Sequence, residues 1–495
     1  MQTISYGSDE KMKLTLKLAT AVLCLIGLNS YGAKAVDIED SDAPAFVRSL
    51  KLLQRGPPEI PIRGRANIIT ETIEQKLDHF DENETRTWQM RYMANDEHFK
   101  AGGPIFIYLG GEWEISPGSI TSGHLVDMAR EHNGYLYYTE HRYYGKSQPT
   151  SSLTKDNMKY LHVKQALADV AHFIVKKKET VPGLENSKVI IAGGSYSATM
   201  VVWFKRLYPE LIAGGWASSA PILAKVDFKE YKEVVGRSFL ELGGKKCYDR
   251  IQNGIAELES MMDNHRDAEV KAMLKICNNF DVDNDLDVYS LFGSISNIFS
   301  GIAQYQRGND IPETCEWLEY FEDDLTAITN FVVSAFGSNS CLDMTYMGNV
   351  EYYLETTYRY GASRPWYYQT CNEYGWYQSS ASRDQPFGRT FPALMYTVLC
   401  KDVFGETFSQ EFIDQQIVQT NTEFGGMNPE VENIHMTQGA LDPWNPMGHG
   451  EQQGAIVIPR ASHCNDFDSI SSSDSAEMRA SKERLAELVR SWVSN

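Results

Sequence analysis

Short, continuously apolar runs divide the first part of the chain, and each is followed by glycine or polar residues. Residues 104–109 (PIFIYL) are closed by Gly110-Gly111, and residues 188–192 (KVIIA) by Gly193-Gly194. Runs without polar alternation are typical of strands that are buried on both faces, as in parallel sheets. We predict four strands here and two near the end of the chain, at residues 104–109, 135–139, 188–192, 214–218, 433–437 and 455–458.

Segments with helical periodicity lie between these strands. Residues 165–175 and 198–208 carry apolar positions at helical spacing, and strands alternating with helices indicate an α/β layered domain. Between about 228 and 405 the strand runs disappear, and residues 251–262, 270–276 and 317–336 are helical in period. We therefore predict an α/β core in two parts, 66–227 and 406–495, which ends in an amphipathic helix, with a mostly helical cap inserted at 228–405.

The first residues have the pattern of a targeting segment. A basic start, an apolar run at residues 18–28 and Ala33-Lys34-Ala35 predict a signal peptide, residues 1–35, cleaved after Ala35. Residues 36–65 are polar with a proline-rich end, and we expect a leader that runs over the surface. No other run approaches the roughly 18 apolar residues of a membrane span, so we expect none.

Charge and cysteine content narrow the class further. The 495 residues carry a formal net charge of −20, which argues against nucleic-acid binding. A signal peptide implies an oxidising compartment, secreted or lysosomal, where the seven cysteines beyond Cys24 can form disulfides. No pair of cysteines has zinc-site spacing, and we expect neither a metal nor a cofactor. Asn83-Glu84-Thr85 is a predicted glycosylation site.

A serine lies where a predicted strand turns into a predicted helix. Ser195, within Gly193-Gly194-Ser195-Tyr196-Ser197, has the context of a nucleophile elbow. The elbow requires small residues two before and two after the serine; Gly193 fits, and Ser197 is small where glycine is usual. A strand–helix turn with serine as an ordinary helix cap is the alternative for this motif alone.

The order of later residues favours catalysis. Asp442 follows the strand at 433–437 and is the only carboxylate between residues 433 and 450, and His463 follows the strand at 455–458. Serine, then acid, then histidine, each after its own strand, is the order of an α/β-hydrolase triad. Ser195 would attack a carbonyl carbon, His463 would move the proton, and Asp442 would orient the histidine.

The neighbouring loops supply candidates for binding. The backbone N–H groups of Tyr196 and Gly111 are placed to stabilise the oxyanion of a tetrahedral intermediate. Glu112 has two interpretations, which the sequence leaves open: it binds a substrate amine, or it pairs structurally with Arg142.

Several motifs resemble one family. The chain is similar to the secreted and lysosomal serine peptidases that include prolyl carboxypeptidase, dipeptidyl peptidase II and thymus-specific serine protease, and looks closest to the thymus-specific branch. The resemblance covers roughly residues 70 to 490 and is carried, in order, by LDHF (77–80), EHRYYGKS (140–147), QALAD (165–169), GGSY (193–196), ASSAP (217–221), WYYQTC (366–371), LDPW (441–444) and SHC (462–464).

The resemblance implies an α/β-hydrolase core with a disulfide-stapled cap, the triad named above, and exopeptidase action on short peptides, often after proline. It places Trp444 near the pocket for the residue before the cut. Sequence order and the resemblance suggest the pairs Cys247–Cys315, Cys277–Cys341 and Cys371–Cys400, with Cys464 free.

Two rival classes share parts of this pattern. A secreted esterase or lipase would have the same elbow and triad but is expected to carry an apolar lid, whereas residues 228–405 are rich in tyrosine and charge. A catalytically inactive binding protein would be expected to lack a triad residue, and none is missing. The sequence allows a homodimer without indicating one.

Overall fold

The structure is a computed structural model and describes residues 43–58, 60–61, 67–337 and 341–494. The predicted signal peptide, residues 1–35, lies outside the described residues, as do residues 36–42 of the predicted leader.

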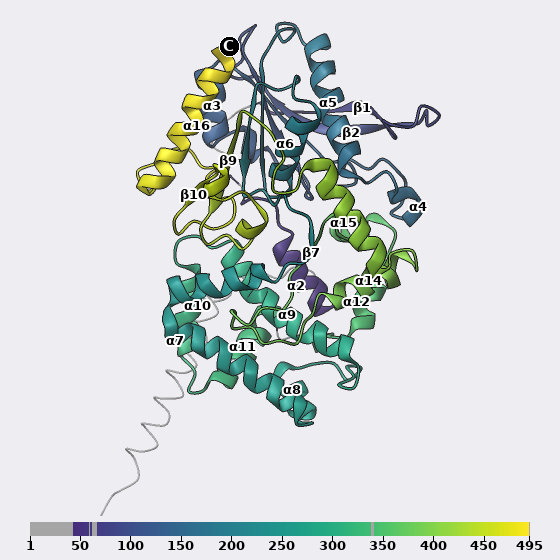
Figure 1. The fold of residues 1–495 in the computed structure, drawn as a ribbon, viewed down its shortest axis with the longest axis vertical. Coiled ribbons are helices and arrows are strands. Elements are labelled where there is room, and N and C mark those ends of the chain that lie inside the picture. Colours follow the sequence, from purple (N-terminus) through teal and green to yellow (C-terminus); the bar gives the residue numbers. More distant parts are fainter. Residues whose placement is uncertain (1–42, 59, 62–66, 338–340, 495) are drawn as a thin grey trace, which may run out of the picture.

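An eight-stranded sheet forms the upper half of the molecule in Figure 1, in the order β1-β2-β4-β3-β5-β6-β9-β10. A hairpin of β1 (Ile69–Lys76) and β2 (Thr87–Asn95) joins β4 antiparallel, and all other pairings are parallel. All six predicted strands are present, as β3 (Ile105–Leu109), β4 (Tyr135–Thr139), β5 (Val189–Gly194), β6 (Gly214–Ser218), β9 (Ile434–Gly439) and β10 (Ile456–Ile458).

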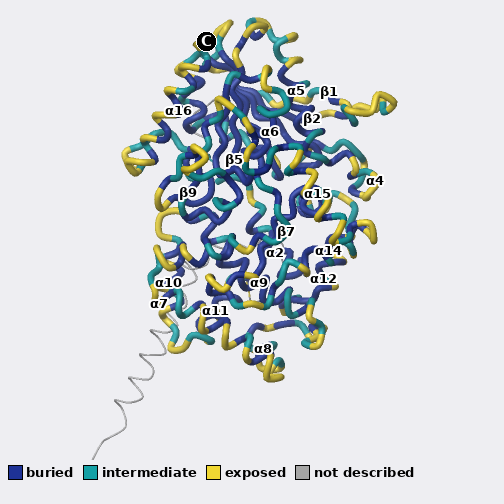
Figure 2. Tube along the Cα trace, viewed as in Figure 1, coloured by how far each residue is buried: buried dark blue, intermediate teal, exposed yellow. Residues whose placement is uncertain are grey.

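Helices cover both faces of this sheet, which explains the unbroken apolar runs. In β3, Ile105 and Ile107 join the core on the face of α5 (Val163–Thr180) and α6 (Tyr196–Leu207), whereas Phe106 and Tyr108 face α3 (His124–Glu131) and α16 (Ala476–Ser494). Side chains alternate between the faces of a strand, so a strand covered on both sides needs apolar residues at every position. The dark centre of the sheet in Figure 2 follows from this.

The chain between β6 and β9 supplies most of the lower half in Figure 1. Short strands β7 (Lys225–Asp227) and β8 (Gly375–Tyr377) pair there, beside α15 (Gln410–Phe424). The other main helices are α7 (Glu230–Asp263), α8 (Asp267–Leu274), α9 (Asp285–Gln304), α10 (Asp310–Glu319), α11 (Asp324–Phe336), α12 (Tyr346–Leu354), α13 (Ser363–Gln369) and α14 (Leu394–Phe404). This is an α/β-hydrolase fold with a mostly helical insertion.

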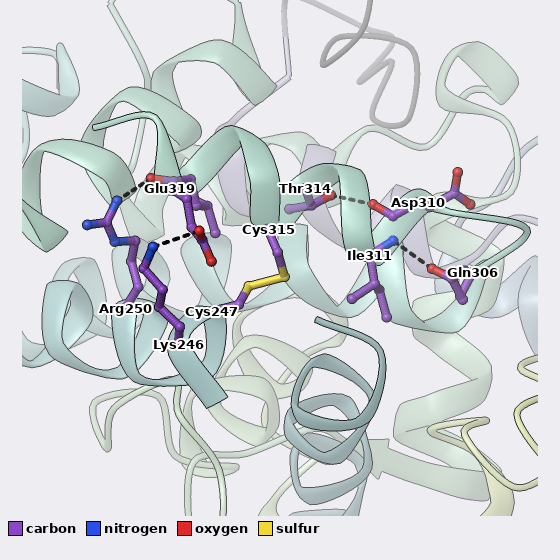
Figure 3. The surroundings of a disulfide bond; sticks show 10 residues. Lys246, Cys247, Arg250, Gln306, Asp310, Ile311, Thr314, Cys315 and Glu319 are labelled. Atoms are coloured by element: carbon purple, nitrogen blue, oxygen red, sulfur yellow. Dashed lines mark hydrogen bonds and ion pairs between the residues drawn. A yellow bond between two sulfur atoms is a disulfide. The ribbon is translucent and has the colours of Figure 1, made fainter. Parts of the chain in front are cut away.

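Three disulfides staple the insertion, and all three predicted pairs are confirmed: Cys247–Cys315, Cys277–Cys341 and Cys371–Cys400. Cys464 is buried and unpaired, also as predicted. Figure 3 shows the first bridge joining α7 to α10, with Lys246 donating a hydrogen bond of 2.7 Å to Glu319 beside it. Disulfides of this number fit the oxidising secretory pathway.

Three expectations differ from the structure. The helical period at 317–336 is two helices, because Asp323 caps a new helix by accepting a hydrogen bond from the Thr326 N–H at 2.7 Å. The insertion contains strand β8, which the sequence pattern did not indicate. Residues 45–53 of the predicted surface leader instead form a buried helix, α2 (Ala45–Leu53).

Helix α2 packs against α9 because α9 carries two glycines where the helices cross. A Cβ atom added at Gly293 would lie 3.0 Å from the Phe46 ring, and one at Gly301 would lie 3.2 Å from Cβ of Leu52. Small residues at a crossing allow a close approach, and Phe46 and Val47 are fully buried as a result. In Figure 1, α2 lies in the middle of the molecule, near the boundary between the sheet and the helical part.

Candidate active site

Ser195 lies at the tight turn from β5 into α6. Its backbone has φ 59° and ψ −131°, a conformation that L-residues rarely adopt. Space around the turn is minimal, since a Cβ at Gly193 would lie 2.4 Å from the carbonyl oxygen of Ser197. Ser197 is accommodated because its hydroxyl accepts a hydrogen bond from the Gly194 N–H and donates one to the Gly194 carbonyl, both at 3.0 Å. The turn has the geometry of a nucleophile elbow.

Asp442 and His463 are brought together from the loops after β9 and β10. The two carboxylate oxygens of Asp442 lie 3.0 and 2.9 Å from Nδ1 of His463, and both side chains are fully buried. Burial lowers the pKa of His463, but the charge and hydrogen bond of Asp442 outweigh it and hold this pKa well above its usual range. Nε2 of His463 is buried and has no hydrogen-bond partner among the described residues. In its neutral form, with the Nδ1–H bound to Asp442, this histidine can accept a proton at Nε2.

The end of cap helix α9 holds the histidine loop, an arrangement that the sequence did not indicate. The Gln304 carbonyl accepts hydrogen bonds from the His463 N–H at 3.1 Å and from the Ser462 hydroxyl at 2.9 Å. The side-chain oxygen of Gln304 accepts from the Trp444 ring N–H at 3.0 Å and from the Tyr231 hydroxyl at 2.6 Å. A single glutamine in a helical run carries no pattern, so only the folded chain reveals this role.

One pocket gathers most of the predicted site residues. Ser195, Tyr196, Glu112 and Trp444 all line it, and its cavity volume is about 50 Å³. Its walls are largely aromatic, with Trp366, Tyr367, Trp376, Tyr377 and Tyr396. Trp376 adopts a positive φ of 61°, and its ring packs edge-on to Trp444 with centroids 5.6 Å apart. Strained backbone of this kind is often retained at binding sites.

Glu112 is buried in this pocket, with 4% of its surface exposed. Its Oε2 atom has no hydrogen-bond partner among the described residues, and burial raises the pKa of the carboxyl to about 8. The interpretation of Glu112 as a structural partner of Arg142 is wrong. Arg142 is fully buried and pairs instead with Asp169, with hydrogen bonds of 2.7 and 2.8 Å.

The hydroxyl of Tyr196 is the centre of a buried polar network. It lies 3.1 Å from Nε2 of His141, 3.0 Å from the side-chain nitrogen of Gln369 and 2.9 Å from the Tyr374 hydroxyl. Gln369 and Tyr374 belong to the insertion, which therefore fixes the residue that follows Ser195. The Trp113 ring packs against Gly111, the other predicted oxyanion donor, so closely that a Cβ at residue 111 would lie 2.4 Å from the ring.

The remaining predicted features lie outside the pocket. Asn83 is exposed in the β1–β2 connection, where its side-chain nitrogen donates a hydrogen bond of 3.1 Å to Asp81. The described part of the chain holds no group of three or more histidine, cysteine or acidic residues suited to a metal ion. In the same residues, no helix is both long and apolar enough to cross a membrane.

The α/β-hydrolase fold thus presents Ser195 at its elbow and pairs Asp442 with His463. Residues 75–485 match the family described as Serine carboxypeptidase S28, and the chain belongs to this family of serine peptidases. Its relatives include the thymus-specific serine protease of Mus musculus, 29% identical over 473 residues that cover 90% of each chain. The human protein of that name is 28% identical over 445 residues, covering 85% of this chain and 86% of its own. The lysosomal Pro-X carboxypeptidase of Bos taurus is 27% identical over 454 residues, covering 86% and 87%. The predicted family is thereby confirmed.

Proposed function

We propose that the protein is a serine exopeptidase that cleaves short peptides close to one end. Ser195 attacks the carbonyl carbon of the scissile bond while Nε2 of His463 takes the hydroxyl proton. The same proton then passes to the leaving amine, and an acyl-enzyme remains on Ser195 until water, activated by His463, hydrolyses it. Asp442 holds the Nδ1–H of His463 and stabilises the imidazolium form.

The tetrahedral intermediates need donors for their oxyanion. Tyr196 is the first residue of α6, where backbone N–H donors have no partner within the helix. Its N–H is the first donor in our proposal, and the Gly111 N–H is the second. Tyr196 is held by the network around its hydroxyl, so its backbone is preorganised before substrate arrives.

The observation that carries the exopeptidase proposal is the state of Glu112. A buried carboxyl with one unpartnered oxygen, in the same pocket as Ser195, is suited to a cationic group brought by the substrate. No lysine or arginine lines this pocket among the described residues. The terminal ammonium of a peptide meets both conditions, and we therefore propose that the enzyme recognises a free amino end.

The aromatic walls support a preference at the residue before the cut. Trp444 and Trp376 present flat apolar surfaces, and the cavity of about 50 Å³ exceeds the roughly 10–15 Å³ that one water needs. Such a site suits a compact apolar side chain, with proline as a good candidate. These walls do not favour the alternative of an esterase or lipase, because their tyrosine hydroxyls and the buried Glu112 differ from an apolar lid.

The disulfides of the chain also bear on the compartment in which the enzyme acts. We propose that residues 1–35 are removed as a signal peptide and that the enzyme acts in a lysosome or outside the cell, with a glycan on the exposed Asn83. The three disulfides support this proposal.

A digest of one peptide in three forms tests the exopeptidase proposal. We expect the free peptide and its C-amidated form to be cleaved alike, and the N-acetylated form to lose at least about 30-fold in kcat/KM, because it leaves Glu112 without a partner. Ser195→Ala serves as the blank for each form. Equal cleavage of all three forms would indicate an endopeptidase. Loss of cleavage on amidation would instead indicate recognition of a free carboxyl end, for which the candidates are Arg55 and Arg307, which line a second cavity beside Tyr305.

A further inference from the structure

The segment that precedes the whole hydrolase fold contributes to the wall of the active-site pocket. Leu50, Leu53 and Gln54, at the end of helix α2, line the same pocket as Ser195 and Trp444. Leu53 is 7% exposed, so its side chain is almost entirely enclosed. Neither the sheet nor the helical insertion supplies this part of the wall.

Several contacts fix the segment in place. The carbonyl of Leu53 accepts a hydrogen bond of 3.0 Å from the side-chain nitrogen of Gln304, whose oxygen binds the Trp444 ring N–H. Four residues further on, Pro57 reaches the elbow itself, since a Cβ at Gly194 would lie 2.6 Å from its Cγ. One glutamine thus sets the relative positions of Leu53 and Trp444 at the pocket.

The segment is also an integral part of the folded chain. Phe46 and Val47 of α2 are fully buried against the insertion, and Arg48 donates a hydrogen bond of 2.7 Å to the Phe336 carbonyl. Removal of α2 would expose these apolar side chains to water. The packing favours a permanent wall over a plug that leaves the cleft on activation.

We propose that Leu53 is a specificity-determining residue, which limits the size of the substrate side chain next to the scissile bond. The inference rests on the proposed function, since it assumes that the peptide occupies the pocket lined by Ser195. A pocket of about 50 Å³ discriminates by fit, and removing apolar atoms from one wall relaxes that fit.

Leu52 is a matched control position for a substitution at Leu53. It lies one residue away on the same helix and is similarly buried at 5% exposed, but it packs towards Gly301 and does not line the pocket. Leu53→Ala and Leu52→Ala remove the same atoms from neighbouring buried positions. Any loss of packing is shared, and only the first substitution enlarges the pocket.

The experiment measures kcat/KM for free-amine peptides that differ only in the residue before the cut: alanine, proline, leucine or phenylalanine. We expect Leu53→Ala to raise the ratio of phenylalanine to alanine substrates by about tenfold, and Leu52→Ala to leave it unchanged. Leu53→Phe, which fills the pocket, should shift the ratio in the opposite direction. Thermal unfolding of each variant identifies any that fails to fold.

The outcomes separate the two proposals. If the wild-type enzyme shows no Ser195-dependent cleavage, the proposed function fails. If it cleaves but Leu53→Ala and Leu52→Ala have the same ratio, the inference about Leu53 is overturned. Sequencing the N-terminus of the active enzyme gives a second check, since a chain that begins beyond Pro58 would lack the wall altogether.

Discussion

Glu112 shows how a single buried group links folding to binding. Its carboxyl is enclosed beside Ser195, and one of its oxygens has no hydrogen-bond partner among the described residues. Enclosing an unpaired carboxylate costs free energy, so burial raises the pKa of this carboxyl to about 8 and favours its protonated form in the free enzyme. In the proposed function, a substrate ammonium supplies the missing partner and favours the ionised form.

Replacing Glu112 by glutamine should change how stability depends on pH. The folded-state pKa is about 8 against a usual value of 4.5, so the folded state holds more protons between these pH values and wild-type stability falls as pH rises through this window. Glu112→Gln removes that loss. We expect the two proteins to unfold alike at pH 4.5, and the variant to be more stable by on the order of 3 kcal/mol at pH 7.

Urea unfolding of both proteins at several pH values measures this difference. Glu140→Gln is an unsuitable comparison because Glu140 is a fully buried partner of Arg91. Glu114, two residues from Glu112, also pairs with Arg91 but is half-exposed, so Glu114→Gln is the milder control. A stability difference between Glu112→Gln and wild type that stays constant with pH would contradict the account of Glu112.

At the scale of elements, the packing of α2 on α9 places the N-terminal segment at the pocket. The crossing depends on Gly293 and Gly301, which lie two turns apart along α9. The sequence predicted a surface leader here because residues 36–65 are polar and proline-rich overall, and a nine-residue helix is too short to dominate such an average. Only the complementary face of α9 identifies it as buried.

Gly301→Val should weaken this crossing, because the new side chain would begin 3.2 Å from Cβ of Leu52. We expect a loss of about 1–3 kcal/mol in the free energy of unfolding, as for other overpacked cores. Gly450→Val is the control: Gly450 has an ordinary φ of −98°, and the nearest atom to a Cβ there would be the Gln453 side-chain oxygen at 3.5 Å, so we expect little loss. Equal melting temperatures for Gly301→Val and wild type would contradict the packing described here.

At the scale of the whole molecule, much of the fold could be predicted because it repeats simple patterns. Continuous apolar runs located six strands, and the order of acid and histidine after their strands anticipated that Asp442 and His463 lie side by side. The missing parts depend on contacts between distant segments. The partner of Arg142 is Asp169 rather than Glu112, and Gln304 joins three segments; neither relation leaves a periodic trace in the sequence.

The central claim is that Ser195 is the nucleophile of this serine peptidase, and a fluorophosphonate probe tests it most directly. Intact-mass and peptide analysis should find one adduct, on Ser195, in the wild type and in Ser197→Gly, which restores the usual glycine of the elbow. Ser195→Ala should remain unlabelled, should unfold like the wild type, and should lose on the order of 10⁶-fold in peptide cleavage. An adduct on another residue, or a Ser195→Ala enzyme that keeps a hundredth of the wild-type rate, would contradict the account.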